Sequence, residues 1–366
     1  MSVKYNQFRA MLAIARGSFI ATLRSPSTVV FSIGFPLVFI LAFAFIGNNS
    51  VPQIEVALSP NADTMNAVYM KIAQAPGIAI KKESPELLKE NLEKGQISAL
   101  LNIQKTNDAR YEISIKTSQA VNPKSIAILT SYLNAVTQDL NKPNNWQANN
   151  SVFINNKIEK IPGRVYRTID FILPGQLGFS LLSAGIFGVA FLFFNLRQQL
   201  VLKRFFATPI TRTYIVFGEA LSRVAFQMIA AVVIIFIGVV FFKFTLVRGW
   251  ITFIEIMILS FFALVVFMGC GFIVSSVAKN ESTIPPFANL FTLPQFLLAG
   301  TFFSIDNFPK WMQPLCNILP LTHFNHAMRE ISFEGASLLS CWKDIGNIFI
   351  WGIIVYAIAI KVFRWE

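Results

Sequence analysis

Six apolar stretches, each about as long as a bilayer is thick, dominate this 366-residue sequence. An α-helix needs about 20 apolar residues to cross a hydrocarbon core of about 30 Å, because it rises about 1.5 Å per residue. Only 14% of the residues are charged, against about 25% in a typical soluble chain. The sequence therefore predicts an α-helical integral membrane protein with six transmembrane helices, over residues 28–46, 171–195, 214–242, 250–277, 284–303 and 345–363.

Basic residues around these stretches predict the orientation of the chain. The loop over residues 195–213, between the second and third stretches, contains four basic residues and no acidic one. Such a loop belongs on the cytoplasmic side of a membrane, and basic residues near both chain ends place both termini there as well. The net charge of +12 is spread around the apolar stretches and is not gathered in one patch, so we expect no nucleic-acid partner.

Residues 47–165 differ from the rest of the chain and hold almost half of its charged residues. Their pattern predicts a small α/β domain. The expected strands cover 54–59, 78–82, 97–103 and 111–116, and the expected helices cover 63–75, 85–94 and 123–140. Because the preceding apolar stretch leaves the cytoplasm, we expect this domain to be extracytoplasmic. The asparagine-rich residues 141–156 are expected to form a loop or linker.

The first 27 residues combine apolar positions at helical spacing with Lys4, Arg9, Arg16 and Arg24. This pattern is typical of an amphipathic helix lying on the inner membrane face, although an ordinary charged leader to the first span would share it. No small-residue cleavage site is evident after these residues, so the stretch over 28–46 is expected to remain as an anchor. Pro36 is expected to kink that span.

Residues 304–343 are interrupted by prolines and contain no piece long enough to span, so we expect re-entrant or interfacial helices on the outer side. His323 and His326 lie three residues apart there, but no cysteine or acid is obviously placed to complete a metal site. Hydrogen bonds within the outer helices are the expected role of both histidines, and no metal is expected. Cys316 and Cys341 lie in the same segment, where an oxidising compartment would permit a disulfide between them.

Two features inside the predicted spans stand out. Glu219 and Arg223 lie four residues apart near the inner end of the third span, which predicts an intramembrane ion pair. Ser180, Ala184 and Gly188 form a stripe of small residues along the second span. Such a stripe permits close helix packing, and we expect it to contribute to an interface between subunits.

Two blocks of the sequence resemble the ATP-binding-cassette type-2 permeases, the membrane subunits of many bacterial exporters. The first block is LKRFFATPITRTYIVFGEAL, in the cytoplasmic loop and the start of the third span. The second block runs from Leu297 to Glu330, near the last two spans. With the order of the spans, the resemblance covers nearly the whole chain.

The resemblance implies a permease subunit of an ATP-driven exporter in the bacterial inner membrane. Two such subunits would lie side by side, each bound by a cytoplasmic ATPase that carries ATP and Mg²⁺, and the substrate would leave between them by alternating access. The sequence lacks the G-x-x-x-x-G-K-[ST] phosphate loop, so we expect no enzyme activity and no cofactor in this chain itself. The exported domain is similar to the multidrug-type branch, which suggests an amphipathic small molecule or lipid as substrate.

The same resemblance suggests that the loop over residues 195–213 couples the permease to its ATPase. A short helix is expected over 199–206, ended by Thr208-Pro209, after which Thr211 can cap the next helix. A basic loop that only fixes topology would fit the spacing equally well. The residues expected to make the coupling contacts are Lys203, Arg204, Phe205, Phe206, Thr208, Pro209 and Arg212.

Two other functions remain open from the sequence. One is a membrane-embedded lipid-modifying enzyme, which would need nucleophilic or charged residues gathered at one membrane depth. The other is a membrane-anchored ligand-binding or signalling protein, which would have no ATPase partner.

Overall fold

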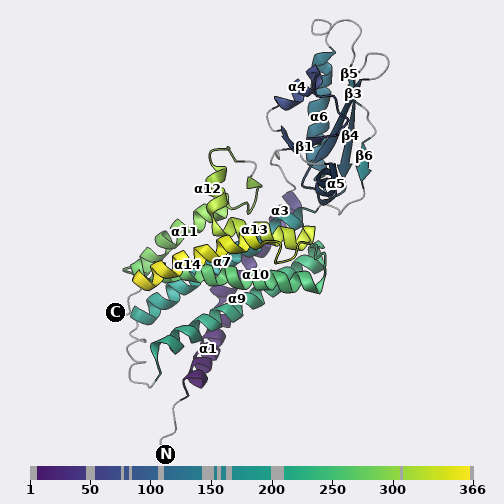
Figure 1. Cartoon of the computed structure of the whole chain (residues 1–366). Coiled ribbons are helices and arrows are strands. Elements are labelled where there is room, and N and C mark those ends of the chain that lie inside the picture. The colour runs from purple at the N-terminus through teal and green to yellow at the C-terminus, as the bar shows by residue number, and fades with distance from the viewer. Residues whose placement is uncertain are drawn as a thin grey trace, which may run out of the picture. The chain divides into compact units, whose positions relative to one another are not determined.

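The computed structural model describes residues 6–46, 54–75, 78–81, 85–105, 111–141, 152–154, 158–161, 167–198, 210–305 and 308–362 (Figure 1). The chain divides into two compact units. One unit comprises residues Asn49–Arg167, and the other comprises Met1–Asn48 together with Thr168–Glu366. The boundary agrees with the composition change in the sequence.

The unit of residues 49–167 contains a mixed sheet. Its strands are β1 (Ile54–Leu58), β2 (Ile78–Lys81), β3 (Ala99–Lys105), β4 (Tyr111–Ser118), β5 (Val152–Ile154) and β6 (Glu159–Ile161). They follow the order β2-β1-β3-β4-β5, and β6 pairs with β4 at the other end of that strand from β5. Only the β3–β4 pair is antiparallel, with Leu101 opposite Ile115. The helices of this unit are α4 (Ala67–Ala73), α5 (Pro85–Lys94) and α6 (Pro123–Leu140).

The sheet and α6 enclose the core of this unit. Alternate residues of β3 and β4 are fully buried, among them Leu101, Ile103 and Ile113. Leu129 and Leu133 of α6 pack against them. The predicted α/β domain is therefore present, but the prediction that residues 141–156 form only a linker was wrong. Strand β5 lies within that segment and is formed by backbone pairing with β4. Three residues are too few to show the alternating pattern of a strand in the sequence.

The other unit is almost entirely helical. Its elements before the sheet-containing unit are α1 (Gln7–Leu23), α2 (Pro26–Val29), the π-helical turn η1 (Val30–Gly34) and α3 (Phe35–Ile46). The long helices after it are α7 (Thr168–Gln198), α9 (Arg212–Phe242), α10 (Trp250–Val277) and α14 (Trp342–Val362). Shorter ones are η2 (Glu281–Thr283), α11 (Ile284–Leu298), α12 (Gln313–Ile318), α13 (Pro320–Arg329) and the π-helical η4 (Glu330–Glu334).

Among the described residues, four helices are long and apolar enough to cross a membrane: Thr168–Gln198, Thr213–Phe242, Trp250–Val277 and Trp342–Val362. They correspond to the second, third, fourth and sixth predicted spans. The first predicted span is divided into α2, η1 and α3. The fifth ends at Leu298 and not near Phe303, so its 15 residues extend only about 22 Å.

The end of α11 has a specific cause. Gly300 adopts a left-handed conformation with φ of +68°, which turns the chain out of the helix. Arg329 then holds this turn, because its Nη2 donates to the carbonyl oxygens of Gly300 at 2.6 Å and Phe171 at 3.1 Å. Its guanidinium also lies 3.7 Å from the centre of the Phe171 ring. One arginine of α13 thus joins the end of α11 to the start of α7.

The irregularity in the first span starts before Pro36. In the π-helical turn, the N–H of Phe35 donates to the carbonyl of Val30. Proline has no N–H, so Pro36 cannot donate to the carbonyl of Ser32, its ordinary α-helical partner. That carbonyl instead accepts a hydrogen bond of 2.7 Å from the hydroxyl of Ser180 in α7. The proline therefore leaves an acceptor for a neighbouring helix.

Glycines allow α7 to approach its neighbours closely. A Cβ on Gly185 would lie 2.8 Å from Cβ of Phe267 in α10, and one on Gly271 would lie 2.7 Å from the carbonyl oxygens of Gly185 and Ile186. Near the start of α7, a Cβ on Gly178 would lie 2.7 Å from Asn325 in α13. These contacts involve a different face of α7 from the predicted stripe of Ser180, Ala184 and Gly188.

Helix α1 packs along α9 (Figure 1). Gly218 allows this contact, because a Cβ there would lie 2.8 Å from the carbonyl oxygen of Met11. Phe8 and Leu23 remain exposed on α1, with exposed fractions of 59% and 47%. Thr211 occupies the N-cap position of α9, but its side chain makes no capping bond. The side chain of Gln7 in α1 instead accepts a hydrogen bond of 3.0 Å from the N–H of Thr211.

Candidate functional site

A cavity of about 900 Å³ lies between residues 25–35, α7 and α9, and two residues of α10 complete its wall. Its volume is within the range of cavities that hold small organic ligands. It extends along the second half of α7 as far as Asn195 and Leu196, close to the last described residue of that helix. Most of the wall is apolar, and its large side chains include Phe35, Phe179, Phe187, Phe191, Phe226 and Met268.

A smaller set of polar side chains is placed on the same wall. Arg223 and Gln227 come from α9, Ser32 from η1 and Asn195 from α7. Gln227 donates a hydrogen bond of 2.8 Å to the hydroxyl of Ser180, which itself donates to Ser32. This chain joins three helices at the cavity wall. It also assigns Ser180 a polar role that its small size did not suggest.

The rest of the predicted small-residue stripe faces the cavity. Ala184 and Gly188 both line it. A Cβ on Gly188 would lie 3.7 Å from Nη1 of Arg223, the nearest atom of another helix in the part of the chain that the structure describes. Gly188 therefore leaves room for the guanidinium. The expected contribution of the stripe to a subunit interface stays a prediction.

The predicted pair of Glu219 and Arg223 is placed one turn apart on α9, but it is not joined by a hydrogen bond. Glu219 Oε1 accepts a hydrogen bond of 2.7 Å from the hydroxyl of Ser18 in α1. Within the described parts of the chain, Glu219 Oε2 and Arg223 Nε are buried without a hydrogen-bond partner. The carboxylate is thus oriented toward α1, while the guanidinium lies at the cavity.

Most of the predicted coupling residues lie outside the described residues: Lys203, Arg204, Phe205, Phe206, Thr208 and Pro209. Arg212 is the first residue of α9, and its side chain is not described. The flanking residues are described. Arg197, near the end of α7, donates to the carbonyl oxygens of Ser275 and Ala278 at 3.0 and 3.1 Å. It therefore binds the C-terminal end of α10, where a cation complements the helix dipole.

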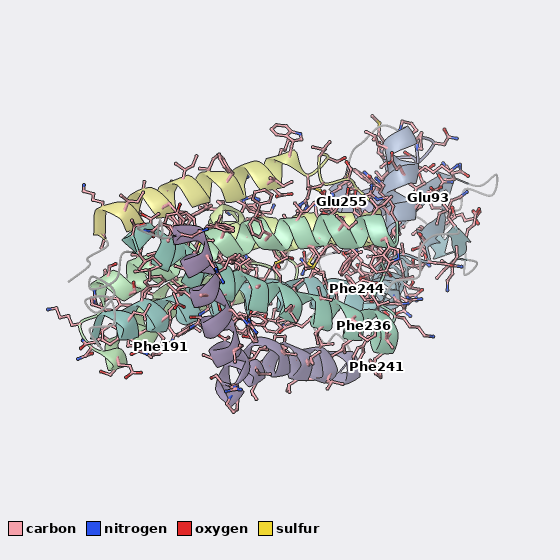
Figure 2. All side chains as sticks on the ribbon, turned by 90° about the horizontal axis from the view of Figure 1, so that it is seen from below. Glu93, Phe191, Phe236, Phe241, Phe244 and Glu255 are labelled. Carbon is pink, nitrogen blue, oxygen red and sulfur yellow. The ribbon has the colours of Figure 1, made fainter. Side chains whose placement is uncertain are left out.

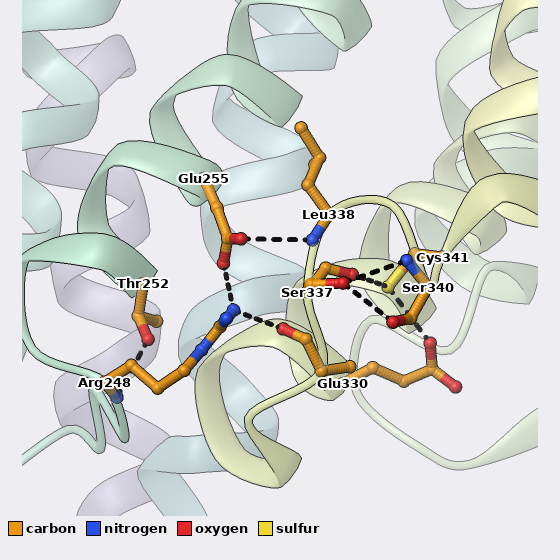
Figure 3. A network of polar contacts seen from close by, with 9 residues as sticks. Arg248, Thr252, Glu255, Glu330, Ser337, Leu338, Ser340 and Cys341 are labelled. Atoms are coloured by element: carbon orange, nitrogen blue, oxygen red, sulfur yellow. Dashed lines mark hydrogen bonds and ion pairs between the residues drawn. The ribbon is translucent and has the colours of Figure 1, made fainter.

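A polar network lies where α10 and α14 begin (Figure 3). Figure 2 places Glu255 toward one end of the helical unit and Phe191, of the cavity wall, toward the other. Arg248 forms an ion pair with Glu255 and donates to the carbonyl oxygen of Ala336 at 2.6 Å. Glu255 also accepts a hydrogen bond of 3.2 Å from the N–H of Leu338. The network joins the α9–α10 turn, α10 and the loop before α14.

Three free cysteines are buried in the described structure, so the possible disulfide between Cys316 and Cys341 is absent from it. Cys341 instead donates a hydrogen bond of 3.2 Å from its thiol to Glu330 Oε2. Burial and this neighbouring carboxylate raise the pKa of the Cys341 thiol. The thiol is consequently a structural group in the network of Figure 3.

His323 and His326 converge on one carboxylate that the sequence did not single out. Nδ1 of His323 lies 2.7 Å from Asp344 Oδ1, and Nδ1 of His326 lies 2.8 Å from Asp344 Oδ2. The expectation of hydrogen bonds within the outer helices is confirmed, with an acid supplied by α14. The hydrogen bond to Asp344 raises the pKa of His326 despite its partial burial. His326, Glu330 and Asp344 also place three potential metal ligands within 4.8 Å of one another.

The raised pKa of His326 predicts a pH-dependent stability. The folded protein binds the histidine proton more tightly than the unfolded chain, so this stabilisation is fully present below the unfolded pKa of about 6.5. It is lost as the pH rises through the higher folded pKa. We expect the melting temperature of the detergent-solubilised protein to fall between about pH 6 and pH 8, and the fall to be smaller in His326→Gln. An unchanged pH profile in that variant would contradict the assignment.

Comparison with known proteins identifies the family. The model of a family described as "ABC-2 family transporter protein" matches residues 26–361. ABC transporter G family member 20 of Dictyostelium discoideum is 26% identical over 212 residues, which cover 56% of this chain and 29% of that protein. The probable multidrug ABC transporter permease YbhR of Escherichia coli K12 is 24% identical over 172 residues, covering 46% of this chain and 45% of that protein.

A third relative, the linearmycin resistance permease protein LnrN of Bacillus subtilis, is 27% identical over 109 residues, covering 30% of this chain and 28% of that protein. The alignments span less than half the length of each of these relatives. No solved structure matches the chain significantly. The family model, in contrast, covers the chain from the start of α2 to the last turn of α14. The chain therefore belongs to the ABC-2 family of transporter proteins.

Proposed function

We propose that this chain is the permease subunit of an ATP-driven exporter that moves an amphipathic molecule outward across the bacterial inner membrane. The observation that supports this most directly is the cavity, whose mostly apolar wall and few polar groups suit an amphipathic molecule. The printed names of two relatives, a probable multidrug permease and a linearmycin resistance permease, are consistent with such a substrate.

The position of the cavity suggests how ATP hydrolysis would act on it. Its wall includes Asn195 and Leu196, the first two residues of the segment 195–213 that the sequence predicts to contact an ATPase. That segment joins α7 to α9, and both helices contribute residues to the cavity wall. Movement of the loop would therefore change the separation of these helices, as alternating access requires. ATP and Mg²⁺ would be bound by a separate cytoplasmic ATPase, and a second permease subunit would complete the pathway.

The proposed orientation can be tested directly. We expect both termini in the cytoplasm and residues 49–167 outside it, because the basic α7–α9 loop belongs inside. The test uses a reporter that is active only outside the cytoplasm. It should be active when inserted at Asn107 and inactive when attached to the C-terminus. A cytoplasmic signal from Asn107 would overturn the orientation.

The ATPase contact is tested by replacing the aromatic pair of the loop. Large aromatic side chains dominate protein interfaces, and truncating a buried anchor commonly costs about 2 kcal/mol or more. Phe205→Ala combined with Phe206→Ala should therefore weaken ATPase binding roughly thirtyfold, since about 1.4 kcal/mol corresponds to a tenfold change. The measurement is co-purification of the ATPase, followed by transport in vesicles.

Asn107→Ala, in the other unit, is the control and should leave ATPase binding unchanged. The double variant should still insert and elute as a folded protein, which separates a lost contact from a lost fold. Wild-type ATPase binding and transport in the double variant would mean that the loop only fixes topology. A chain that recruits no ATPase at all would instead support the ligand-binding or signalling function.

A further inference from the structure

Among the described residues that line the cavity, Arg223 is the one that is ionisable. It is the twelfth residue of the 31-residue helix α9, which is long and apolar enough to cross a membrane. A guanidinium keeps its charge in proteins. Charged side chains inside membrane spans are costly and usually mark a functional site. The cavity therefore carries a permanent positive charge.

The described structure does not provide this charge with a bonded counter-ion. Glu219, the nearest acid along α9, uses one carboxylate oxygen to accept the hydrogen bond from Ser18. Arg223 Nε is buried without a hydrogen-bond partner in the described parts of the chain. Arg223 is partly buried and is attracted by Glu219 without a hydrogen bond to it, so a bound anion would give the guanidinium the direct charge-assisted contact that Glu219 does not. The site is thus electrostatically incomplete when it is empty.

The space beside the guanidinium and the cavity wall define what kind of anion fits. Gly188 has no side chain there, and a Cβ at this position would already lie 3.7 Å from Arg223 Nη1. Phe187 and Phe191 continue the wall along α7, and Phe226 follows Arg223 on α9. A small inorganic anion would leave most of a 900 Å³ cavity and its aromatic surface unused. An apolar tail attached to the anion would bury that surface.

We infer that the cavity binds an amphipathic anion, with Arg223 holding a carboxylate or phosphate headgroup and the phenylalanines enclosing the tail. This deepens the proposed function, on which it rests, by naming the charge of the molecule that the exporter accepts. Arg223 is the specificity-determining residue of the site. Gly188 is the residue whose missing side chain leaves space for the headgroup.

The test uses the full chain alone in nanodiscs of zwitterionic lipid, so that it requires neither ATPase nor transport. Three probes share one diazirine-bearing alkyl tail and end in a carboxylate, a phosphate monoester or a hydroxyl. After illumination, mass spectrometry measures the labelling of peptides from α7 and α9. A charge-assisted hydrogen bond to Arg223 is available to the carboxylate and the phosphate, and it is stronger than the bond that the hydroxyl can make. We therefore expect both anionic probes to bind at least about tenfold more tightly than the alcohol.

Three variants separate the headgroup contact from the fold. Arg223→Gln should abolish the preference for anions while leaving weak labelling by all three tails, and Arg223→Lys should keep part of the preference. Gly188→Leu should fill the space and reduce labelling by every probe. Equal labelling by the alcohol in the wild-type protein, or an anion preference that survives in Arg223→Gln, would overturn the inference.

The same assay distinguishes the source of the anion. If phosphatidylglycerol in the nanodisc competes with the probes, the natural occupant is an anionic membrane lipid. If it does not compete, the occupant is a smaller amphiphile, and either result supports an anionic site. Loss of anion preference in a chain that still recruits its ATPase would refute this inference alone. Retained anion binding in a chain that recruits no ATPase would refute the exporter function alone.

Discussion

Replacing Gly271 by alanine should destabilise the helical unit by about 3 kcal/mol, the upper end of the cost of overpacking a core. The added Cβ would lie 2.7 Å from the carbonyl oxygens of Gly185 and Ile186 and 2.8 Å from Cβ of Val189. Backbone carbonyls of α7 cannot rotate aside as a flexible side chain can, so the two helices must separate. The measurement is the melting temperature of the detergent-solubilised protein, followed by size-exclusion fluorescence.

Gly346→Ala provides the matched control. Gly346 is also inside a long apolar helix, α14, and a Cβ there would meet no atom within 4 Å. Since alanine favours a helix by up to about 1 kcal/mol over glycine, this variant should be neutral or slightly stabilised. Equal melting temperatures for Gly271→Ala and the wild-type protein would show that the α7–α10 contact is looser than the structure describes.

Replacing Arg248 by methionine should cost about 3 kcal/mol, because it leaves the carboxylate of Glu255 without its cation. Only 15% of the Glu255 side chain is exposed, so water replaces the lost partner poorly. The variant also removes the hydrogen bond to the carbonyl oxygen of Ala336. Its melting temperature should therefore fall, and the loop of residues 335–341 should become accessible to proteases before the helices unfold.

Arg248→Met combined with Glu255→Met is the informative partner variant. Removing both charges eliminates the unpaired carboxylate, so the double variant should be more stable than Arg248→Met alone. If the losses in unfolding free energy of the two single variants simply add in the double variant, the residues do not act as a pair. A double variant as unstable as the sum of its parts would then assign the loss to the contacts with Ala336 and Leu338.

The sequence by itself was sufficient for the broad architecture. Long apolar stretches identify α7, α9, α10 and α14 closely, and for α10 the predicted bounds Trp250–Val277 are those of the structure. Likewise, the helices expected over 85–94 and 123–140 have the bounds of α5 and α6. These features follow from local rules, namely hydrophobic length, periodicity and the absence of a proline N–H. The quoted blocks that resemble the type-2 permeases also led to the family that comparison then showed.

The tertiary structure decided which side chains meet. Nothing near His326 in the sequence indicates Asp344, because the two are 18 residues apart and come from different helices. The close contacts between α7 and its neighbours are made at Gly178 and Gly185, while Ala184 and Gly188 of the predicted stripe line the cavity. The spacing of small residues along one helix does not reveal which face a neighbouring helix covers. Likewise, β5 and β6 exist because β4 pairs with them.

The cavity was the least accessible feature from the sequence. Glu219 and Arg223 lie at a helical spacing that predicts a pair. In the structure Glu219 accepts a hydrogen bond from Ser18 of α1 and attracts Arg223 without a hydrogen bond to it. Ser180 has the small size of a packing residue, but its hydroxyl donates to the carbonyl of Ser32, which Pro36 leaves without its helical N–H donor. Both outcomes depend on a third helix placed by the fold. Local spacing determines which residues can interact along one helix, and only the packing of several helices determines which of those interactions form.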